Sequence, residues 1–288
     1  MRIALTTKVA IVTGGASGIG AALCAALVEQ AVEVVLADRQ IELAETVAAT
    51  LRRRGGKATA VELDVRDASA FRDLVAATHA RCGRLDYLFN NAGIVIGGRA
   101  LAFTAADWDE VIDVNIRGVA HGILAAYPLM VRQGAGHIIN TASMAGLTPV
   151  PLMISYAAAK YAVVGMSRAL RMEAAPHGVK VTALCPGLVR TPIMTGGRYG
   201  RIKPELDPTV NQAMAESLHP MDPALLAQRV LRALRRNPAI IIEPRRWRLG
   251  WYFDRLLPAV FAAASSRVMD HWLRRHEAAQ SGDKRANK

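Results

Sequence analysis

The chain has 288 residues and a net charge of +12, and 52% of its residues are hydrophobic while 21% are charged. This composition excludes an intrinsically disordered chain and favours one large α/β domain with a buried core. The three cysteines, Cys24, Cys82 and Cys185, fit neither a metal site nor a disulfide framework. We therefore predict reduced thiols and no bound metal.

Short apolar segments alternate with helical patterns along most of the chain. Strands are predicted at Lys8–Val12, Val32–Ala37, Ala58–Leu63, Leu85–Phe89, His137–Thr141, Val179–Leu184 and Ala239–Ile242. Helices are predicted at Gly18–Gln30, Glu42–Arg54, Ala68–Arg81, Ala105–Arg132, Ile154–Ala175 and Pro223–Arg236. This alternation predicts an α/β fold: a single doubly wound Rossmann-type domain with a mostly parallel, seven-stranded sheet covered on both faces.

Two stretches depart from the alternation. The residues from Gly187 to Pro223 hold several Gly and Pro, which predicts a long functional loop with a short helix. Residues 245–288 hold ten cationic and four anionic side chains, a net charge of +6. We therefore predict a main domain over residues 1–244 and a basic, helical C-terminal extension over residues 245–288.

A glycine-rich turn, Thr13-Gly14-Gly15-Ala16-Ser17-Gly18-Ile19-Gly20, joins the first predicted strand to the first helix. Glycines permit positive φ and leave room for a pyrophosphate, while the helix N-terminus offers free N–H groups and a positive dipole end. Many such turns are only tight turns. The position in the first βα unit predicts that this one binds a dinucleotide, through Gly14, Ser17, Gly18, Ile19 and Gly20.

Asp38 ends the second strand, 18 residues beyond Gly20. A carboxylate there accepts hydrogen bonds from the adenosine ribose hydroxyls and repels the 2′-phosphate of NADP. Arg39 could instead bind that phosphate, and the pair could also be a helix-start Asp beside a solvent-exposed Arg. Because position 17 is Ser rather than a second cation, we predict NAD as the cofactor in preference to NADP.

The turn is one of several motifs that occur together. Thr13–Gly20, Asn90-Asn91-Ala92-Gly93, Asn115, Ser143, Tyr156-x-x-x-Lys160 and Pro186-Gly187 resemble the motif set of the classical short-chain dehydrogenase/reductase (SDR) family, in its order and spacing, across residues 8–192. The resemblance implies an oxidoreductase that interconverts a secondary alcohol and a ketone or aldehyde by hydride transfer.

The residue types support the same chemistry. Tyr156 and Lys160 are four apart on a predicted helix and share a face, so the ammonium is expected to lower the pKa of the phenol. Tyr156 could then exchange a proton with the substrate oxygen while hydride moves. Ser143 could hydrogen-bond that oxygen, or be an ordinary strand-end serine.

Further roles come from the resemblance alone. It implies that Lys160 holds the nicotinamide ribose and that Asn115 supports a water relay from Lys160. The cofactor is expected beside Asn91, Ala92 and Gly93, with its adenine near Asp64 and Val65 and its carboxamide near the Val189 main chain and the Thr191 hydroxyl, after Pro186 and Gly187. Without the resemblance, Asn115 would be a structural helix residue and Asp64 a helix cap.

The end of the main domain departs from many family members, which close a tetramer with a Gly-rich strand carrying Asp-Gly-Gly. Here Ala239–Glu243 runs into Pro244-Arg245-Arg246, as in relatives that act on apolar alcohols and ketones. We expect a homodimer or homotetramer and a small apolar alcohol or carbonyl substrate. The substrate wall is predicted to come from Met144–Met153 and from the loop Leu188–Pro220, whose apolar residues include Met144, Leu147, Val150, Leu152, Met153, Leu188, Ile193 and Met194.

The extension combines apolar and aromatic residues at spacings of three and four with many arginines, and Pro258 is expected to divide it into two helices. One hypothesis is an interfacial amphipathic helix in peripheral contact with a membrane. The other is a helical pair that covers the active-site entrance or forms a dimer interface. We interpret the remaining positive charge as a solubilising surface and predict no nucleic-acid partner.

Two alternatives to catalysis follow from these patterns: a non-catalytic NAD-binding sensor or scaffold, and a membrane-surface binder acting through residues 245–288. The intact set of Ser143, Tyr156 and Lys160 favours the enzyme. No signal-peptide pattern follows Met1 and no run of 18 uncharged apolar residues occurs, so no membrane-spanning helix is expected. The predicted location is cytoplasmic, with peripheral membrane contact through the extension.

Overall fold

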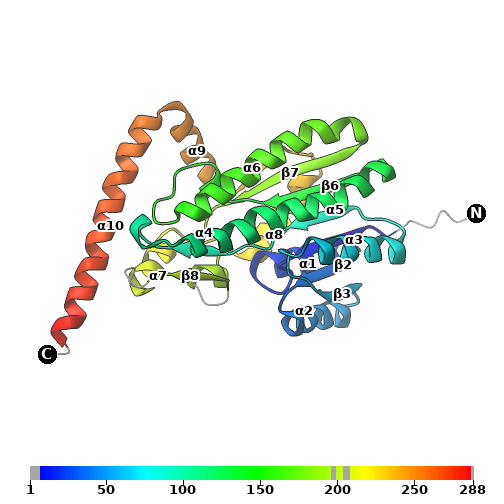
Figure 1. Cartoon of the computed structure of the whole chain (residues 1–288), viewed down its shortest axis with the longest axis horizontal. Coiled ribbons are helices and arrows are strands. Elements are labelled where there is room, and N and C mark those ends of the chain that lie inside the picture. The colour runs from blue at the N-terminus through cyan, green and yellow to red at the C-terminus, as the bar shows by residue number, and fades with distance from the viewer. Residues whose placement is uncertain (1–6, 196–198, 204–207, 287–288) are drawn as a thin grey trace, which may run out of the picture.

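A computed structural model describes residues 7–195, 199–203 and 208–286, with side chains excepted at 194–195, 208–211, 214 and 276–286. Seven strands form one parallel sheet in the order β3-β2-β1-β4-β6-β7-β9 (Figure 1). They are β1 Val9–Thr13, β2 Glu33–Asp38, β3 Ala58–Glu62, β4 Tyr87–Asn90, β6 Gly136–Thr141, β7 Val179–Pro186 and β9 Ile240–Glu243. The predicted doubly wound fold is therefore confirmed.

Helices cover both faces of the sheet. Alternate strand residues point to opposite faces, so Ala10 and Val12 join one hydrophobic core while Val9 and Ile11 join the other. The first core packs against α1, α2 and α8, and the second against α3, α5 and α6. These helices are α1 Gly18–Val28, α2 Ile41–Arg53, α3 Ala68–Cys82, α5 Gly118–Gln133, α6 Ile154–Ala174 and α8 Pro223–Leu234.

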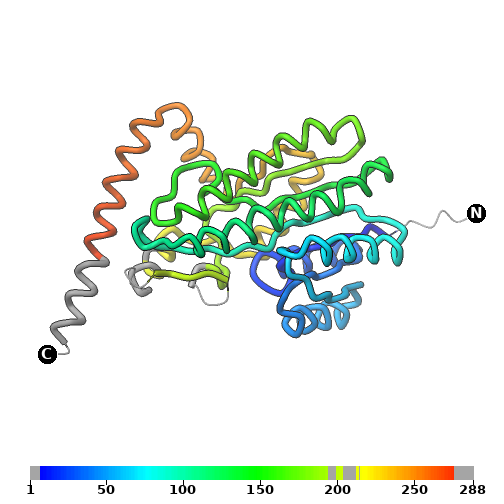
Figure 2. Tube along the Cα trace, viewed as in Figure 1, coloured from blue at the N-terminus to red at the C-terminus, as the bar shows by residue number. Residues whose placement is uncertain are grey.

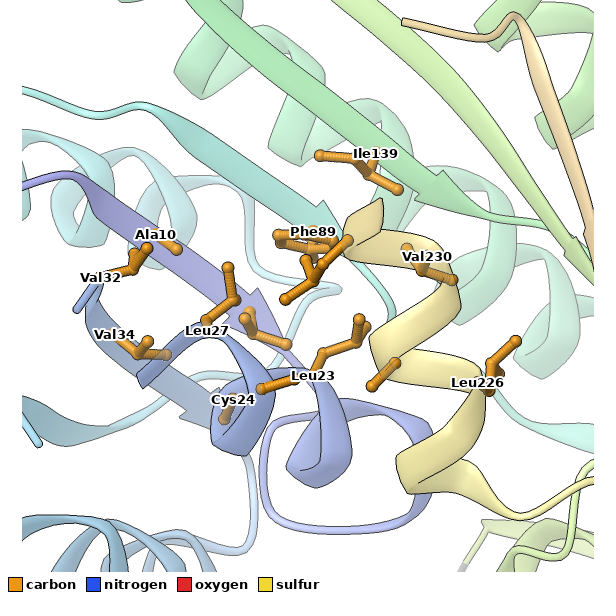
Figure 3. Close-up of a cluster of buried hydrophobic side chains, with 14 of the residues drawn as sticks. Ala10, Leu23, Cys24, Leu27, Val32, Val34, Phe89, Ile139, Leu226 and Val230 are labelled. Carbon is orange, nitrogen blue, oxygen red and sulfur yellow. The ribbon is translucent and has the colours of Figure 1, made fainter. Parts of the chain in front are cut away.

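Figure 3 shows the core that holds the first helix in place. Leu23 and Leu27 of α1 meet Leu226 and Val230 of α8 over the ring of Phe89, and all five side chains are almost fully buried. Because α1 starts at the glycine-rich turn, this packing fixes where the N-terminal N–H groups of α1 point.

The three cysteines form no disulfide with one another and differ in burial. Cys24 and Cys185 are fully buried, and burial raises the pKa of the Cys185 thiol to about 12. Cys82 is half-buried, with its Sγ 3.4 Å from Glu33 Oε1.

A π-helical turn, η2 Asp113–Arg117, interrupts the helix that runs from α4 Ala105–Ile112 into α5. By length and composition alone, the continuous helix Ala105–Gln133 could cross a membrane, which differs from the sequence expectation. Its α5 part packs against the sheet through Val119, Ala126 and Met130, as the core helix of a doubly wound domain does.

The stretch expected to be a loop contains more structure than was predicted. It holds η5 Pro192–Thr195, the strand β8 Gly200–Ile202 and the helix α7 Pro208–Ser217. Strand β8 pairs in parallel with β5 Val95–Gly97, forming a second, two-stranded sheet. Lys203 N also donates to Gly97 O at 2.8 Å, so the stretch is held beside the end of β4.

The C-terminal extension forms two helices, α9 Trp247–Leu256 and α10 Pro258–Ala286, divided at Pro258 as predicted. Trp247 and Trp251 of α9 pack against a third hydrophobic cluster formed by residues of α5, α6, β7 and β9. Figure 2 shows α10 running apart from the sheet at one end of the molecule.

Candidate active site

A cavity of about 430 Å³ opens at the carboxyl ends of the strands, where the strand order reverses between β1 and β4. Ligands of doubly wound sheets bind at this position. Most of the predicted residues line it: Gly14, Ser17, Gly18, Ile19, Asp38, Arg39, Asp64, Val65, Asn91, Ala92, Gly93, Ser143, Tyr156, Lys160, Pro186, Gly187, Val189 and Thr191. Gly20 and Asn115 do not line the cavity.

The turn between β1 and α1 has no room for a side chain at two of its glycines. Gly14 has a φ of +65°, and a Cβ on Gly20 would lie 1.9 Å from the Gly14 carbonyl oxygen. Gly20 therefore keeps the turn closed from behind rather than contacting a ligand. The turn and the helix N-terminus leave the backbone cradle that a pyrophosphate needs, so the residues fit a bound dinucleotide.

Asp38 is buried at the end of β2 and is held by two main-chain groups. Ala16 N donates to its Oδ2 at 3.0 Å and Gln40 N donates to its Oδ1 at 3.0 Å. The carboxylate thereby joins the glycine-rich turn to β2, while Arg39 beside it is exposed. Asp64 is paired with Arg66, and this hydrogen bond lowers the pKa of the Asp64 carboxyl.

A chain of hydrogen bonds links the first strand to Lys160. Asn91 N donates to Thr13 Oγ1 at 2.9 Å, and Asn91 Nδ2 donates to Thr13 O at 3.0 Å. Thr141 Oγ1 donates to Asn91 Oδ1 at 3.3 Å, and Lys160 Nζ donates to Thr141 O at 2.8 Å. The cofactor turn and Lys160 are thus fixed in one polar framework across three strand ends.

Tyr156 and Lys160 lie one turn apart on α6, with Lys160 Nζ 5.5 Å from the centre of the Tyr156 ring. Ser143 precedes the 3₁₀ turn η3 Met144–Gly146, which packs tightly on α6: a Cβ on Gly146 would lie 2.4 Å from Lys160 O. This packing brings Ser143 to Tyr156, and the two form a hydrogen bond. The three predicted side chains therefore converge in one cavity.

The expected lowering of the Tyr156 pKa is not what the structure gives. Burial raises the pKa of Tyr156, because the phenolate loses water, and the hydrogen bond with Ser143 only partly opposes this. Burial also lowers the pKa of Lys160 to about 8. The sequence shows that Lys160 is a charged neighbour of Tyr156, but it does not show how far the Tyr156 hydroxyl is removed from water.

Asn115 sits in the π-helical turn η2 and is completely buried. Its Nδ2 donates to Ile94 O at 2.8 Å and its Oδ1 accepts from Ile94 N at 2.9 Å. Both amide atoms therefore hold the main chain that follows Gly93. A Cβ on Gly93 would approach Asn115 Oδ1 at 3.1 Å and Lys160 Nζ at 3.4 Å, which places both groups around this glycine. The water relay through Asn115 stays a prediction.

Comparison with known proteins agrees with this geometry. The family model described as short chain dehydrogenase matches residues 8–199. The chain belongs to the short-chain dehydrogenase family. It is 40% identical over 189 residues to 2,5-dichloro-2,5-cyclohexadiene-1,4-diol dehydrogenase of Sphingobium indicum, covering 66% of this chain and 76% of the relative. It is 37% identical over 214 residues to an uncharacterized oxidoreductase of Staphylococcus aureus, covering 74% and 90%.

Solved structures agree as well. A short-chain dehydrogenase/reductase from Burkholderia phymatum, crystallised in complex with NAD, aligns with a TM-score of 0.77 and 28% identity over 88% of this chain and 95% of the other. Levodione reductase aligns with a TM-score of 0.74 and 30% identity over 82% and 95%. By its family, this short-chain dehydrogenase is an oxidoreductase.

The substrate side of the dehydrogenase pocket is mainly apolar, and most of its predicted residues are present. Met144, Val150, Leu152, Met153, Leu188 and Ile193 line the cavity. Leu147 is an exception, because it is buried in the neighbouring hydrophobic cluster instead. The side chain of Met194 lies outside the described residues. Thr148, Tyr199, Ile202 and Leu218, from the two segments predicted to form the wall, also line the cavity. Sequence reasoning missed Trp247 and Trp272 of the C-terminal extension.

An ion-pair cluster that the sequence did not reveal anchors the substrate loop of this dehydrogenase. Asp107 of α4 is buried and accepts from Lys203 Nζ at 2.7 Å and from Arg201 Nη2 at 3.2 Å. Burial alone would raise the pKa of Asp107, but hydrogen bonds from Lys203 and Thr104 hold it well below its ordinary value. Arg201 also pairs with Glu110. A second link is the donation of Gln40 Nε2 to Tyr199 Oη at 3.1 Å.

Proposed function

We propose that this short-chain dehydrogenase is NAD-dependent and interconverts an apolar secondary alcohol and its ketone. The observation that carries the proposal is the convergence of Ser143, Tyr156 and Lys160 in the cavity that the Gly14–Gly20 turn also borders. A sensor or scaffold would need the turn but none of these three side chains.

The residues divide the reaction between them. A bound nicotinamide dinucleotide would supply the hydride acceptor for alcohol oxidation and the hydride donor for carbonyl reduction. Tyr156 takes the hydroxyl proton in oxidation and donates it in reduction. Ser143 donates a hydrogen bond to the substrate oxygen, which bears more negative charge in the transition state. Lys160, held by Thr141 O, adds positive charge beside the phenol and is placed to hold the ribose.

The cofactor preference rests on the end of β2. Asp38 is buried, borders the cavity and is fixed by two main-chain donors, so its charge lies where a 2′-phosphate would have to fit. Arg39 beside it is exposed and also borders the cavity. The fixed, buried charge supports NAD over NADP.

The substrate class rests on the opposite wall. Methionine, leucine, isoleucine and tryptophan side chains dominate it, which favours an uncharged, apolar molecule. The names of two similar proteins denote a dehydrogenase of a ring diol and a reductase of a dione, and both fit alcohol–carbonyl interconversion.

The test is NADH absorbance with a panel of apolar secondary alcohols, and with the matching ketones in reverse. Because burial raises the Tyr156 pKa, oxidation should speed up as pH rises and reduction should slow down. Cofactor binding without turnover of any panel member would support the sensor. Opposite pH trends would contradict the role of Tyr156.

The remaining expectations concern assembly and location. A homodimer or homotetramer and a cytoplasmic location stay predictions, to be measured by sedimentation and by fractionation of cells.

A further inference from the structure

Helix α9 carries apolar residues on two sides. Its inner side places Trp247 and Trp251 on the third hydrophobic cluster. Its other side carries Leu249, Tyr252, Phe253 and Leu256, spaced by three and four residues along one stripe. These side chains are exposed, Leu249 by 74% and Leu256 by 77%. A stripe of this kind is unusual on a monomer surface unless it contacts a partner.

The exposed stripe continues onto the next helix. Leu257, at the end of α9, and Val260 and Val268 of α10 are each at least 50% exposed. The rings of Phe253 and Phe261 meet edge-on with their centres 6.0 Å apart, which joins the two helices at their corner. We call the exposed residues Leu249, Tyr252, Phe253, Leu256, Leu257, Val260 and Val268 the outer face.

Positive charge surrounds the outer face. The side chains described between residues 245 and 275 include seven Arg and only two acids, Asp254 and Asp270. Arg245, Arg267, Arg274 and Arg275 are exposed. Arg255 lies over the Trp251 ring at 5.5 Å, with its charge at the border of the apolar stripe. Apolar side chains bordered by arginine match the headgroup region of an anionic bilayer.

A second copy of the chain is the other possible occupant. A symmetric dimer would place the same surface of each copy against the other, and seven arginines with two acids would then face an identical set. Like charges brought together oppose association, whereas anionic phospholipid neutralises them. We propose that the outer face docks on an anionic lipid surface.

Docking would also set how substrate arrives. Trp247 of α9 and Trp272 of α10 line the active-site cavity, so the extension is both a wall of the pocket and the proposed lipid contact. This step rests on the proposed function: an apolar alcohol or ketone dissolved in the lipid would enter beside these tryptophans.

The experiment is sedimentation of the full chain with vesicles of phosphatidylcholine, with and without phosphatidylglycerol. We expect binding to the anionic vesicles that weakens with salt. The double variant Leu249→Ser/Leu256→Ser should bind at least about tenfold more weakly, because two exposed leucines lose their apolar burial. The variant Arg245→Gln/Arg267→Gln should weaken binding only to the anionic vesicles.

The matched control is Leu124→Ser/Met172→Ser, which removes side chains of similar exposure, 70% and 79%, from α5 and α6. It should bind vesicles like the wild type. The proposal would be overturned if Leu249→Ser/Leu256→Ser and the control lost vesicle binding equally. It would also be overturned if the wild type did not bind vesicles. A third contrary outcome is a wild type that forms a dimer and binds no vesicles, together with a Leu249→Ser/Leu256→Ser variant that no longer forms this dimer. NADH-linked turnover of a water-soluble alcohol should persist in that variant, which separates docking from catalysis.

Discussion

The cofactor side and the substrate side of the cavity are built differently. The cofactor side consists of glycine backbone and buried polar groups with fixed partners, such as Asp38 on Ala16 N and Lys160 on Thr141 O. The substrate side consists mostly of apolar side chains from the segment after β6, from the loop after β7 and from the C-terminal helices. The family match ends at residue 199, so Lys203, Leu218, Trp247 and Trp272 lie beyond it. The cofactor side lies within the family match, whereas part of the substrate side lies beyond it.

The largest effect is expected where the two sides meet. Tyr156→Phe should lower kcat by about a hundredfold to ten-thousandfold, because it removes the oxygen that exchanges the proton and keeps the ring. Calorimetric NAD affinity should stay near that of the wild type. Tyr161→Phe, at an exposed position on the same helix, is the control and should turn over normally. Near-normal oxidation by Tyr156→Phe would remove this residue from the mechanism.

A change confined to the cofactor side should alter cofactor choice alone. Asp38→Asn should narrow the NAD over NADP preference by roughly 30-fold, about 2 kcal/mol, because a buried charge near the 2′-position is lost. The measurement is kcat/KM with both cofactors at one substrate concentration range. Arg39→Ala should shift the ratio the other way. A wild type that already prefers NADP would show that Arg39 outweighs Asp38.

A change in the ion-pair cluster of Asp107, Lys203 and Arg201 should leave cofactor binding unchanged. Asp107→Asn should raise the substrate KM about tenfold, because the buried carboxylate no longer holds Lys203 and Arg201. Lys203→Met tests the same contact from the loop, without disturbing the cap that Asp107 forms with Thr104. Asp109→Asn, exposed on the same helix, is the control. If Asp107→Asn weakened NAD binding as much as it raised the substrate KM, the cofactor side and the substrate side would not be independent.

The smallest effect on activity is expected in the sheet that both sides share, where a substitution should change stability instead. Burial, with Lys180 and Arg171 nearby, lowers the pKa of His137 to about 3 from an ordinary 6.5. The unfolded chain therefore binds more protons between these values, so stability falls with pH from 6.5 toward 3, by at most about 1.4 kcal/mol per pH unit. His137→Gln should give a shallower fall in urea denaturation than the wild type. His177→Gln, at an exposed position, should keep the wild-type slope.

The sequence was most informative about the cofactor side. Its strands are continuous apolar runs, and its motifs need particular residue types at short spacing, so Gly14, Asp38, Tyr156 and Lys160 could be found without coordinates. The π-helical turn at Asn115 could not, because local propensity favours an ordinary α-helix there. Asp107 and Lys203 are 96 positions apart and have no motif in common, so only the fold brings them together. The direction of the Tyr156 pKa shift depends on how deeply the phenol is buried, and the spacing of residues in the sequence does not give this.

The two-stranded sheet of β5 and β8 has a consequence for the order in which the protein assembles and comes apart. Its paired residues Val95 and Gly200 are farther apart in the sequence than any paired residues of the main sheet, where the longest separation is that of Ala10 and Tyr87 in β1 and β4. Closing so long a loop costs chain entropy before three paired residues can offset it. The small sheet should therefore form after the main sheet and open before it. On gentle heating, the enzyme should lose its substrate wall while it still binds the dinucleotide.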